Sequence, residues 1–173
     1  LLKSVNRSMK LLKLTLMVWI LFLCTLLAGC QLPVAVNTAG PSSAPKTVEL
    51  GAEVELKLGE TALISGQQLR LTFDKVTEDS RCPSSVSCVW SGIVNVQMTL
   101  ASQSQPSETF VVGGATDGQG VITKAIPQAS GPVSWPYGGF VVELKQVTPY
   151  PARTDKPIAP GAYKVIVVIT AAN

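Results

Sequence analysis

Cysteine is the residue type with the clearest potential for chemistry in this chain. A thiol can act as a nucleophile, hold a metal ion or form a disulfide, and the 173 residues include four cysteines. No histidine is present, so a Ser-His-Asp triad, a Cys-His pair and a His-ligated zinc site are all excluded. The informative feature is therefore where the cysteines stand, at positions 24, 30, 82 and 88.

Cys30 ends a segment that is built like an export signal. Every charged residue before it is basic: Lys3, Arg7, Lys10 and Lys13. The apolar run over residues 14–27 is about 14 residues long, shorter than the roughly 20 that span a bilayer. The chain then reads Leu27-Ala28-Gly29-Cys30, which resembles the lipobox of bacterial lipoproteins. The resemblance implies that residues 1–29 are a cleaved signal peptide and that Cys30 carries lipid; the alternative is a hydrophobic core segment or signal anchor that ends in Gly-Cys.

The next stretch has the composition of a tether. Residues 30–46 contain three prolines, a glycine and two serines but few apolar side chains, which is typical of a flexible or extended linker. Gln31 after the lipidated cysteine resembles outer-membrane lipoproteins of two-membrane bacteria. We expect a lipid anchor in the cell membrane or outer membrane and an exported domain, periplasmic or extracellular, over residues 47–173.

The charge of the exported part argues against nucleic acid as a partner. The chain has 14 Lys and Arg and 11 Asp and Glu; removing the four basic residues of the signal leaves 10 against 11, a net charge of −1. No basic cluster remains that could follow a phosphate backbone. Asp74, Glu78 and Asp79 lack the Asp-x-Asp-x-Asp-Gly spacing that wraps calcium, and neither a metal nor another cofactor is predicted.

Cys82 and Cys88 are the two cysteines left for the domain. Because export places them where disulfides persist, we expect them to pair and to close a tight loop between two strands. Such a loop stabilises the fold by roughly 2 kcal/mol. Trp90 shares strand parity with Cys88 and Val94, which predicts that its side chain packs inward over the bridge.

The residues around this loop resemble a motif of uncharacterised bacterial lipoproteins and secreted proteins. The motif is Asp-Ser-Arg-Cys-Pro, a few residues, then Cys-x-Trp-x-Gly, and here it spans residues 79–92 with Ser91 in place of the usual Ala. The resemblance extends over about residues 58–170 and implies export and a fold, but no established activity. For Asp79 and Arg81 we predict a turn cap and a local ion pair that orders the loop, with a ligand site as the alternative.

Alternating apolar and polar residues recur along the domain. Period-two alternation predicts a strand, or two strands broken near Gly51, over residues 48–58, and further strands over residues 69–73 and 94–100. Others are expected over residues 109–112, 121–125, 140–147 and 163–170, the last of them central because it is apolar on both parities. About seven strands predict an all-β fold, either an antiparallel β-sandwich or a small barrel.

Two large aromatic residues stand in a segment whose glycines and prolines disfavour regular structure. Trp135 and Tyr137 lie within residues 131–139, which we expect to form a loop. Exposed, they would offer a surface to a sugar or a protein; folded back, they would cap one end of the core.

The absence of histidine and of a free thiol favours a non-enzymatic envelope lipoprotein, whose domain binds an envelope protein or glycan or has a structural role. One alternative is a protease or lysozyme inhibitor that presents rigid loops, for which residues 113–120 and the Trp135 loop are candidates. Another is a small hydrolase that uses two carboxylates. Its candidate residues are Glu78, Asp79, Asp117 and Glu143.

Overall fold

The computed structural model describes residues 44–172. The predicted signal peptide, Cys30 and the tether up to residue 43 lie outside these described residues. Lys46, placed at the end of the predicted tether, already begins the first strand. Within residues 44–172 the structure contains no helix long and apolar enough to cross a membrane.

Ten strands and one 3-10 turn make up the domain. They are β1 (Lys46–Val48), β2 (Glu53–Lys57), β3 (Thr61–Ile64), β4 (Leu69–Asp79), β5 (Val94–Ser102), β6 (Glu108–Thr116), β7 (Ile122–Lys124), β8 (Ser134–Tyr137), β9 (Phe140–Thr148), η1 (Pro160–Ala162) and β10 (Lys164–Ala171).

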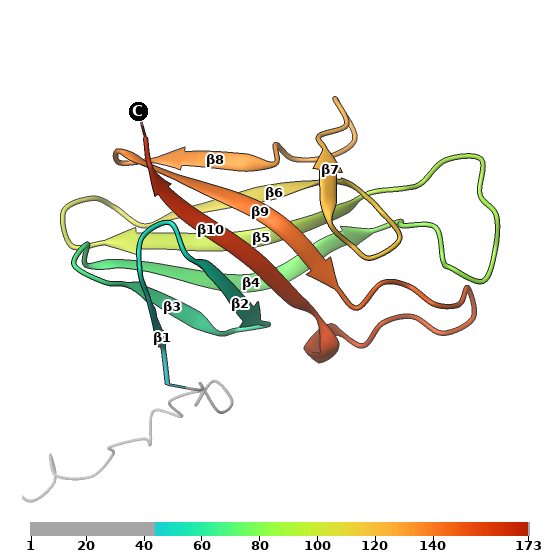
Figure 1. The fold of residues 1–173 in the computed structure, drawn as a ribbon, viewed down its shortest axis with the longest axis horizontal. Helices are drawn as coiled ribbons and strands as arrows, with labels where there is room; N and C mark the ends of the chain where they lie inside the picture. Colours follow the sequence, from blue (N-terminus) through green and yellow to red (C-terminus); the bar gives the residue numbers. More distant parts are fainter. Residues whose placement is uncertain (1–43, 173) are drawn as a thin grey trace, which may run out of the picture. The chain divides into compact units, whose positions relative to one another are not determined.

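The strands form two sheets that stack as a sandwich (Figure 1). One has six strands in the order β1-β3-β4-β5-β6-β7, and the other has four in the order β2-β10-β9-β8. All neighbouring pairs are antiparallel except β1 and β3. The prediction of an all-β fold is confirmed. Of the two predicted architectures, a sandwich and a small barrel, the structure shows the sandwich.

The core lies between the sheets and follows the predicted alternation. Leu69, Leu71 and Phe73 of β4 are buried, while Arg70 between them is exposed. β10 lies between β2 and β9, which confirms the central position predicted for the strand that is apolar on both parities. The first predicted strand is indeed broken: Gly51, at φ 84°, lies in the turn between β1 and β2, and these strands join different sheets.

Two strands, β3 and β8, were missed, and two segments expected to be loops are strand in part. β3 has four residues, too few for alternation to stand out. β8 lies within residues 131–139, expected to be a loop, because an edge strand tolerates a proline that cannot donate to the ladder. Residues 113–116 continue β6, since glycines at 113 and 114 allow close approach: a Cβ at Gly113 would collide with the carbonyl oxygen of Val94.

Candidate functional site

The long connection between β4 and β5 is closed by the predicted disulfide. Cys82 and Cys88 are bonded, with their Cα atoms 5.9 Å apart, so this prediction is confirmed. Figure 1 shows the connection projecting at one end of the sandwich, beyond the ends of the strands. A covalent bridge between residues only six apart leaves the projecting chain few conformations.

Backbone hydrogen bonds fix the base of this loop. The amide of Ser80 donates to the carbonyl oxygen of Ile93 at 2.9 Å, and the amide of Cys82 donates to that of Ser91 at 2.9 Å. Gly92 makes the close approach of the two arms possible: its φ is 73°, and a Cβ there would collide with the carbonyl of Ser80. The loop is therefore a defined structure continuous with the sheet.

Arg81 and Asp79 form a buried ion pair beneath the loop. The Arg81 Nε and Nη2 atoms donate to the two carboxylate oxygens of Asp79 at 2.8 and 2.6 Å. Arg81 also donates to the carbonyl oxygens of Val147 at 2.7 Å and Pro149 at 3.0 Å, and its guanidinium lies 5.3 Å from the centre of the Tyr150 ring. Its side chain has no exposed surface and that of Asp79 is 9% exposed. This geometry shows the predicted local ion pair, and it orders the loop.

Tyr163 completes the network from the other sheet. Its hydroxyl donates to Asp79 Oδ2 at 2.9 Å. Burial and, next, the negative charge of Asp79 raise the pKa of Tyr163 to about 12, because both disfavour the phenolate. Sequence reasoning missed this residue, since a contact between positions 84 apart leaves no local pattern.

Trp90 points away from the core, so the prediction that it packs inward is wrong. Trp90 is 55% exposed. The parity argument assumed a continuous strand from Cys88 to Val94, but β5 begins only at Val94 and Gly92 turns the backbone in between. Alternation holds only while the chain stays extended.

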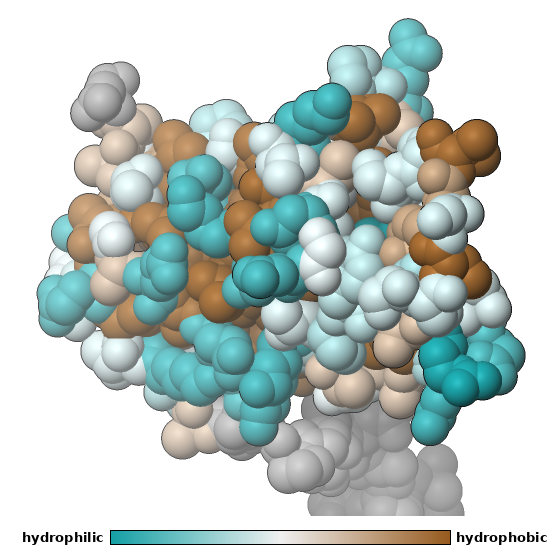
Figure 2. All heavy atoms as spheres, turned by 45° about the vertical axis from the view of Figure 1, so that its right-hand side comes forward, coloured by the Kyte–Doolittle hydropathy of each residue, from teal (hydrophilic) through white to brown (hydrophobic). Residues whose placement is uncertain are grey.

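Trp90 is not alone in its exposure. Val89 is fully exposed at 108% and Val86 is 44% exposed. Only one other large apolar residue of the described chain, Val121, is exposed. Figure 2 turns this end of the molecule forward and shows brown apolar side chains standing at its surface.

We call this surface the disulfide tip: the exposed apolar residues Val86, Val89 and Trp90 with the four serines around them, Ser84, Ser85, Ser87 and Ser91. The side-chain hydroxyls of these serines make no hydrogen bond to any part of residues 44–172. No residue from 82 to 92 carries a charge. The tip therefore combines an apolar centre with free hydroxyl groups.

Trp135 and Tyr137 fold back on the sandwich. The side chain of Tyr137 is buried in the core, with 6% exposure, and its hydroxyl donates to the carbonyl oxygen of Pro106 at 2.9 Å. The indole of Trp135 stacks on Phe110, with ring centres 5.5 Å apart and planes 7° from parallel. These positions agree with the core-capping alternative and leave little of either side chain for recognition.

The four carboxylates considered for hydrolysis are each engaged with a different partner. Asp79 holds Arg81, Glu78 accepts from Asn95 at 3.3 Å, and Asp117 accepts from two backbone amides of its own turn. Glu143 pairs with Lys145 at 2.9 Å.

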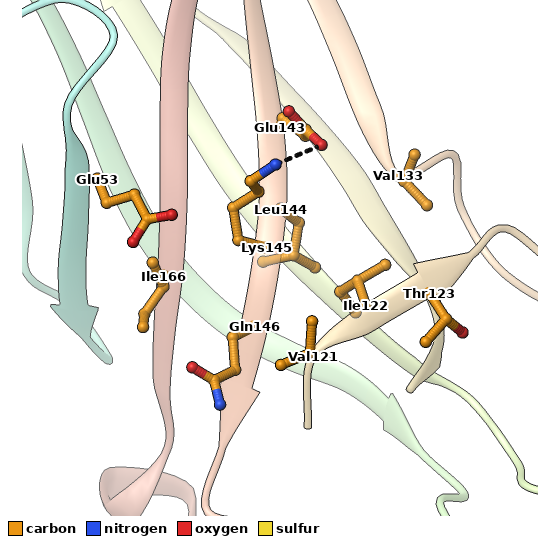
Figure 3. A pocket seen from close by; sticks show the side chains of 10 residues that line it. All are labelled: Glu53, Val121, Ile122, Thr123, Val133, Glu143, Leu144, Lys145, Gln146 and Ile166. Atoms are coloured by element: carbon orange, nitrogen blue, oxygen red, sulfur yellow. Dashed lines mark hydrogen bonds and ion pairs between the residues drawn. The ribbon is translucent and has the colours of Figure 1, made fainter. Parts of the chain in front are cut away.

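A pocket of about 280 Å³ on the outer face of the four-stranded sheet does hold two carboxylates, Glu53 and Glu143. Figure 3 shows that Glu143 turns to Lys145 and that the two carboxylates do not point toward each other. The described residues also contain no group of three His, Cys, Asp or Glu that could hold a metal ion.

Comparisons with protein-family models, with curated proteins and with solved structures found no match. The resemblance to uncharacterised lipoproteins stays a prediction.

One sequence signal could have pointed to the tip. Residues 82–92 are uncharged and lie between two strands, where a surface loop usually carries polar or charged side chains. Two valines and a tryptophan in such a loop are either buried by it or offered to a partner. Sequence reasoning chose burial for Trp90 and did not consider the two valines.

Proposed function

We propose that the protein is a lipid-anchored protein of the cell envelope whose β-sandwich is a non-catalytic binding domain, with the disulfide tip as its binding surface. The observation that carries the proposal is the full exposure of Val89, with Trp90 beside it, on a loop closed by a disulfide. Exposed apolar side chains that are grouped on one part of the surface are typical of interaction sites.

The rigidity of the loop supports a binding role for its apolar residues over an exposure that serves no function. The disulfide, the paired arms and the buried Arg81 all limit the conformations of the tip before it meets a partner. Binding then costs less conformational entropy, so even a small contact surface gains affinity. Tryptophan is also among the residues enriched at the centres of protein interfaces.

The place where the chain enters the domain suits this arrangement. β1 begins toward one end of the sandwich, whereas the loop of residues 80–92 projects from the opposite end (Figure 1). The disulfide tip therefore lies at the opposite end of the sandwich from the residue at which the first strand begins. The tip could then reach a partner in the surrounding compartment.

Inhibition of a protease or lysozyme is a second candidate, favoured by the same locked, projecting loop. Of the segments first considered for it, residues 113–116 lie in β6 and Trp135 lies in β8, so only the turn at residues 117–119 is an exposed loop. An inhibitor of this fold would insert the disulfide tip into the enzyme's cleft. Assays of the purified domain against serine proteases and lysozyme, with Val89→Ser as the control, test this candidate.

The anchor is tested by replacing Cys30. The natural chain should incorporate labelled fatty acid and remain with the membrane fraction, whereas Cys30→Ser should do neither and should accumulate as an uncleaved precursor. Membrane affinity should come from the acyl chains. Normal labelling and processing of the Cys30→Ser variant would contradict the proposed anchoring.

A further inference from the structure

We infer that the partner of the disulfide tip is a protein, and that Val89 and Trp90 enter an uncharged, apolar pocket on its surface. This inference rests on the proposed binding function and names the class of partner. The loop that carries the tip projects from the end of the sandwich (Figure 1), and a projecting surface is matched by a concave one.

The absence of charge narrows the choice of partner. From Cys82 to Gly92 no side chain is ionised, so nothing in the tip would attract the phosphates of a nucleic acid or of an anionic lipid surface. A charged pocket would lose hydration against Val89 and Trp90 without a compensating ion pair. An apolar pocket has no hydrated charge, so it would not incur this loss.

The serines favour a protein over the interior of a bilayer. Their hydroxyls have no partner within the described residues, and burying an unpaired hydroxyl in hydrocarbon is unfavourable. At a protein surface the same groups would pair with backbone or side-chain groups around the pocket. An apolar centre with a polar rim is the usual anatomy of a protein interface.

The adjacent loop of residues 149–160 enlarges the surface. The amide of Ser84 donates to the carbonyl oxygen of Pro151 at 3.0 Å, which joins this loop to the base of the tip. Arg153 and Asp155 form an exposed ion pair on it, each side chain 65% exposed, and Lys156 is exposed beside them. Because a stable interface takes roughly 20 to 30 residues on each side, we assign this loop to the rim of the contact.

The test places a photoreactive benzoylphenylalanine at Val89 in the full chain, expressed in the organism's own envelope. A matched chain carries the same group at Val121, the other exposed valine, which lies outside the tip. We expect an adduct with one protein from position 89 and not from position 121. That protein is then purified, and its affinity for the domain is measured with Trp90→Ser, Val89→Ser and Val121→Ser. The first two changes should weaken binding by roughly 30-fold and the third should leave it unchanged.

A parallel arm measures binding to vesicles of phosphatidylethanolamine and phosphatidylglycerol in a Trp135→Phe background, so that Trp90 reports alone within the domain. We expect no blue shift of its fluorescence. A blue shift, with no protein adduct, would overturn the inference while keeping the tip as a binding surface. No adduct and no shift would overturn both the inference and the proposed binding surface. Equal loss of affinity with Val121→Ser would likewise contradict a pocket for the tip.

Discussion

Tyr163 and Asp79 join the two sheets of the sandwich through one hydrogen bond of 2.9 Å. Asp79 is the last residue of β4 in the six-stranded sheet, and Tyr163 directly precedes β10 in the four-stranded one. The same carboxylate holds Arg81, which binds the carbonyl oxygens at the end of β9. This single network therefore ties the base of the disulfide loop to both layers of the fold.

The stability of the domain should fall at high pH because of Tyr163. The pKa of Tyr163 is raised to about 12 from its ordinary value of 10.0, so the folded state favours the protonated phenol. The stability that this gives is fully present below pH 10 and should be lost as the pH rises from 10 to 12. Unfolding in urea at a series of pH values should show the loss, and Tyr163→Phe should lessen it. Absorbance at 295 nm should show a late-titrating tyrosine that is missing in the variant; a normal titration of all tyrosines would contradict the network.

Asp79→Asn should be severely destabilising. The change leaves a buried guanidinium without its counter-charge, for which the expected loss is about 3 to 5 kcal/mol of unfolding free energy. Chemical denaturation measures it, and Asp155→Asn is the matched control, since the Arg153–Asp155 pair is exposed and should contribute nothing measurable. The double change Asp79→Asn with Arg81→Met should be less harmful than Asp79→Asn alone, because no buried charge remains. Equal stability of Asp79→Asn and the natural domain would refute the structural role.

Removing the disulfide should weaken the domain without unfolding it. Because the bridge closes a short loop, replacing both Cys82 and Cys88 by Ser should cost about 2 kcal/mol. Far-ultraviolet circular dichroism should keep its β-sheet form, since the sandwich core lies away from the loop. Mass measurement of the natural domain, alkylated with and without reduction, should find two reactive thiols only after reduction. Free thiols in the unreduced protein would contradict the pairing.

Tyr137 should behave as a core residue. Tyr137→Ala empties a buried site and should cost about 3 to 5 kcal/mol, whereas Tyr137→Phe should cost about 1 kcal/mol by removing the bond to the carbonyl oxygen of Pro106. Thermal and urea unfolding compare the two. If Tyr137→Ala left stability unchanged, the ring would not be part of the core, and a recognition role for this aromatic pair would gain support.

Trp90 should behave in the opposite way. Since more than half of its side chain is already in water, Trp90→Ser should lower stability by less than about 1 kcal/mol. The same measurement on Trp135→Ala is the control, because that indole stacks on Phe110 and its loss exposes part of the core edge. A loss of several kcal/mol at Trp90 would mean that the tip is built for packing, and would withdraw it as a binding surface.

The class of fold and the disulfide could be predicted from the order of the residues alone. Alternation in residues 69–73 and 94–100 predicts half-buried strands because successive side chains of any extended chain point to opposite faces, whatever the surroundings. Residues 163–170 are instead apolar on both parities, which predicts a central strand, and β10 lies at such a position. The disulfide followed from counting, since only Cys82 and Cys88 were left to pair once the other two were assigned to the signal and the anchor. Alternation depends on neighbouring residues, and the disulfide pairing depends on the number of cysteines. Neither requires knowledge of the folded structure.

The residues that reach solvent at the ends of those strands could not be predicted without the folded arrangement. Parity predicted Trp90 to be buried, but parity fails where Gly92 turns the chain out of the strand. β8 is a strand because β9 pairs with it, although Pro136 within it and the glycines and proline around it disfavour one. The partnership of Tyr163 with Asp79 depends on how two sheets stack, and a contact made by residues far apart in sequence has no period to reveal it.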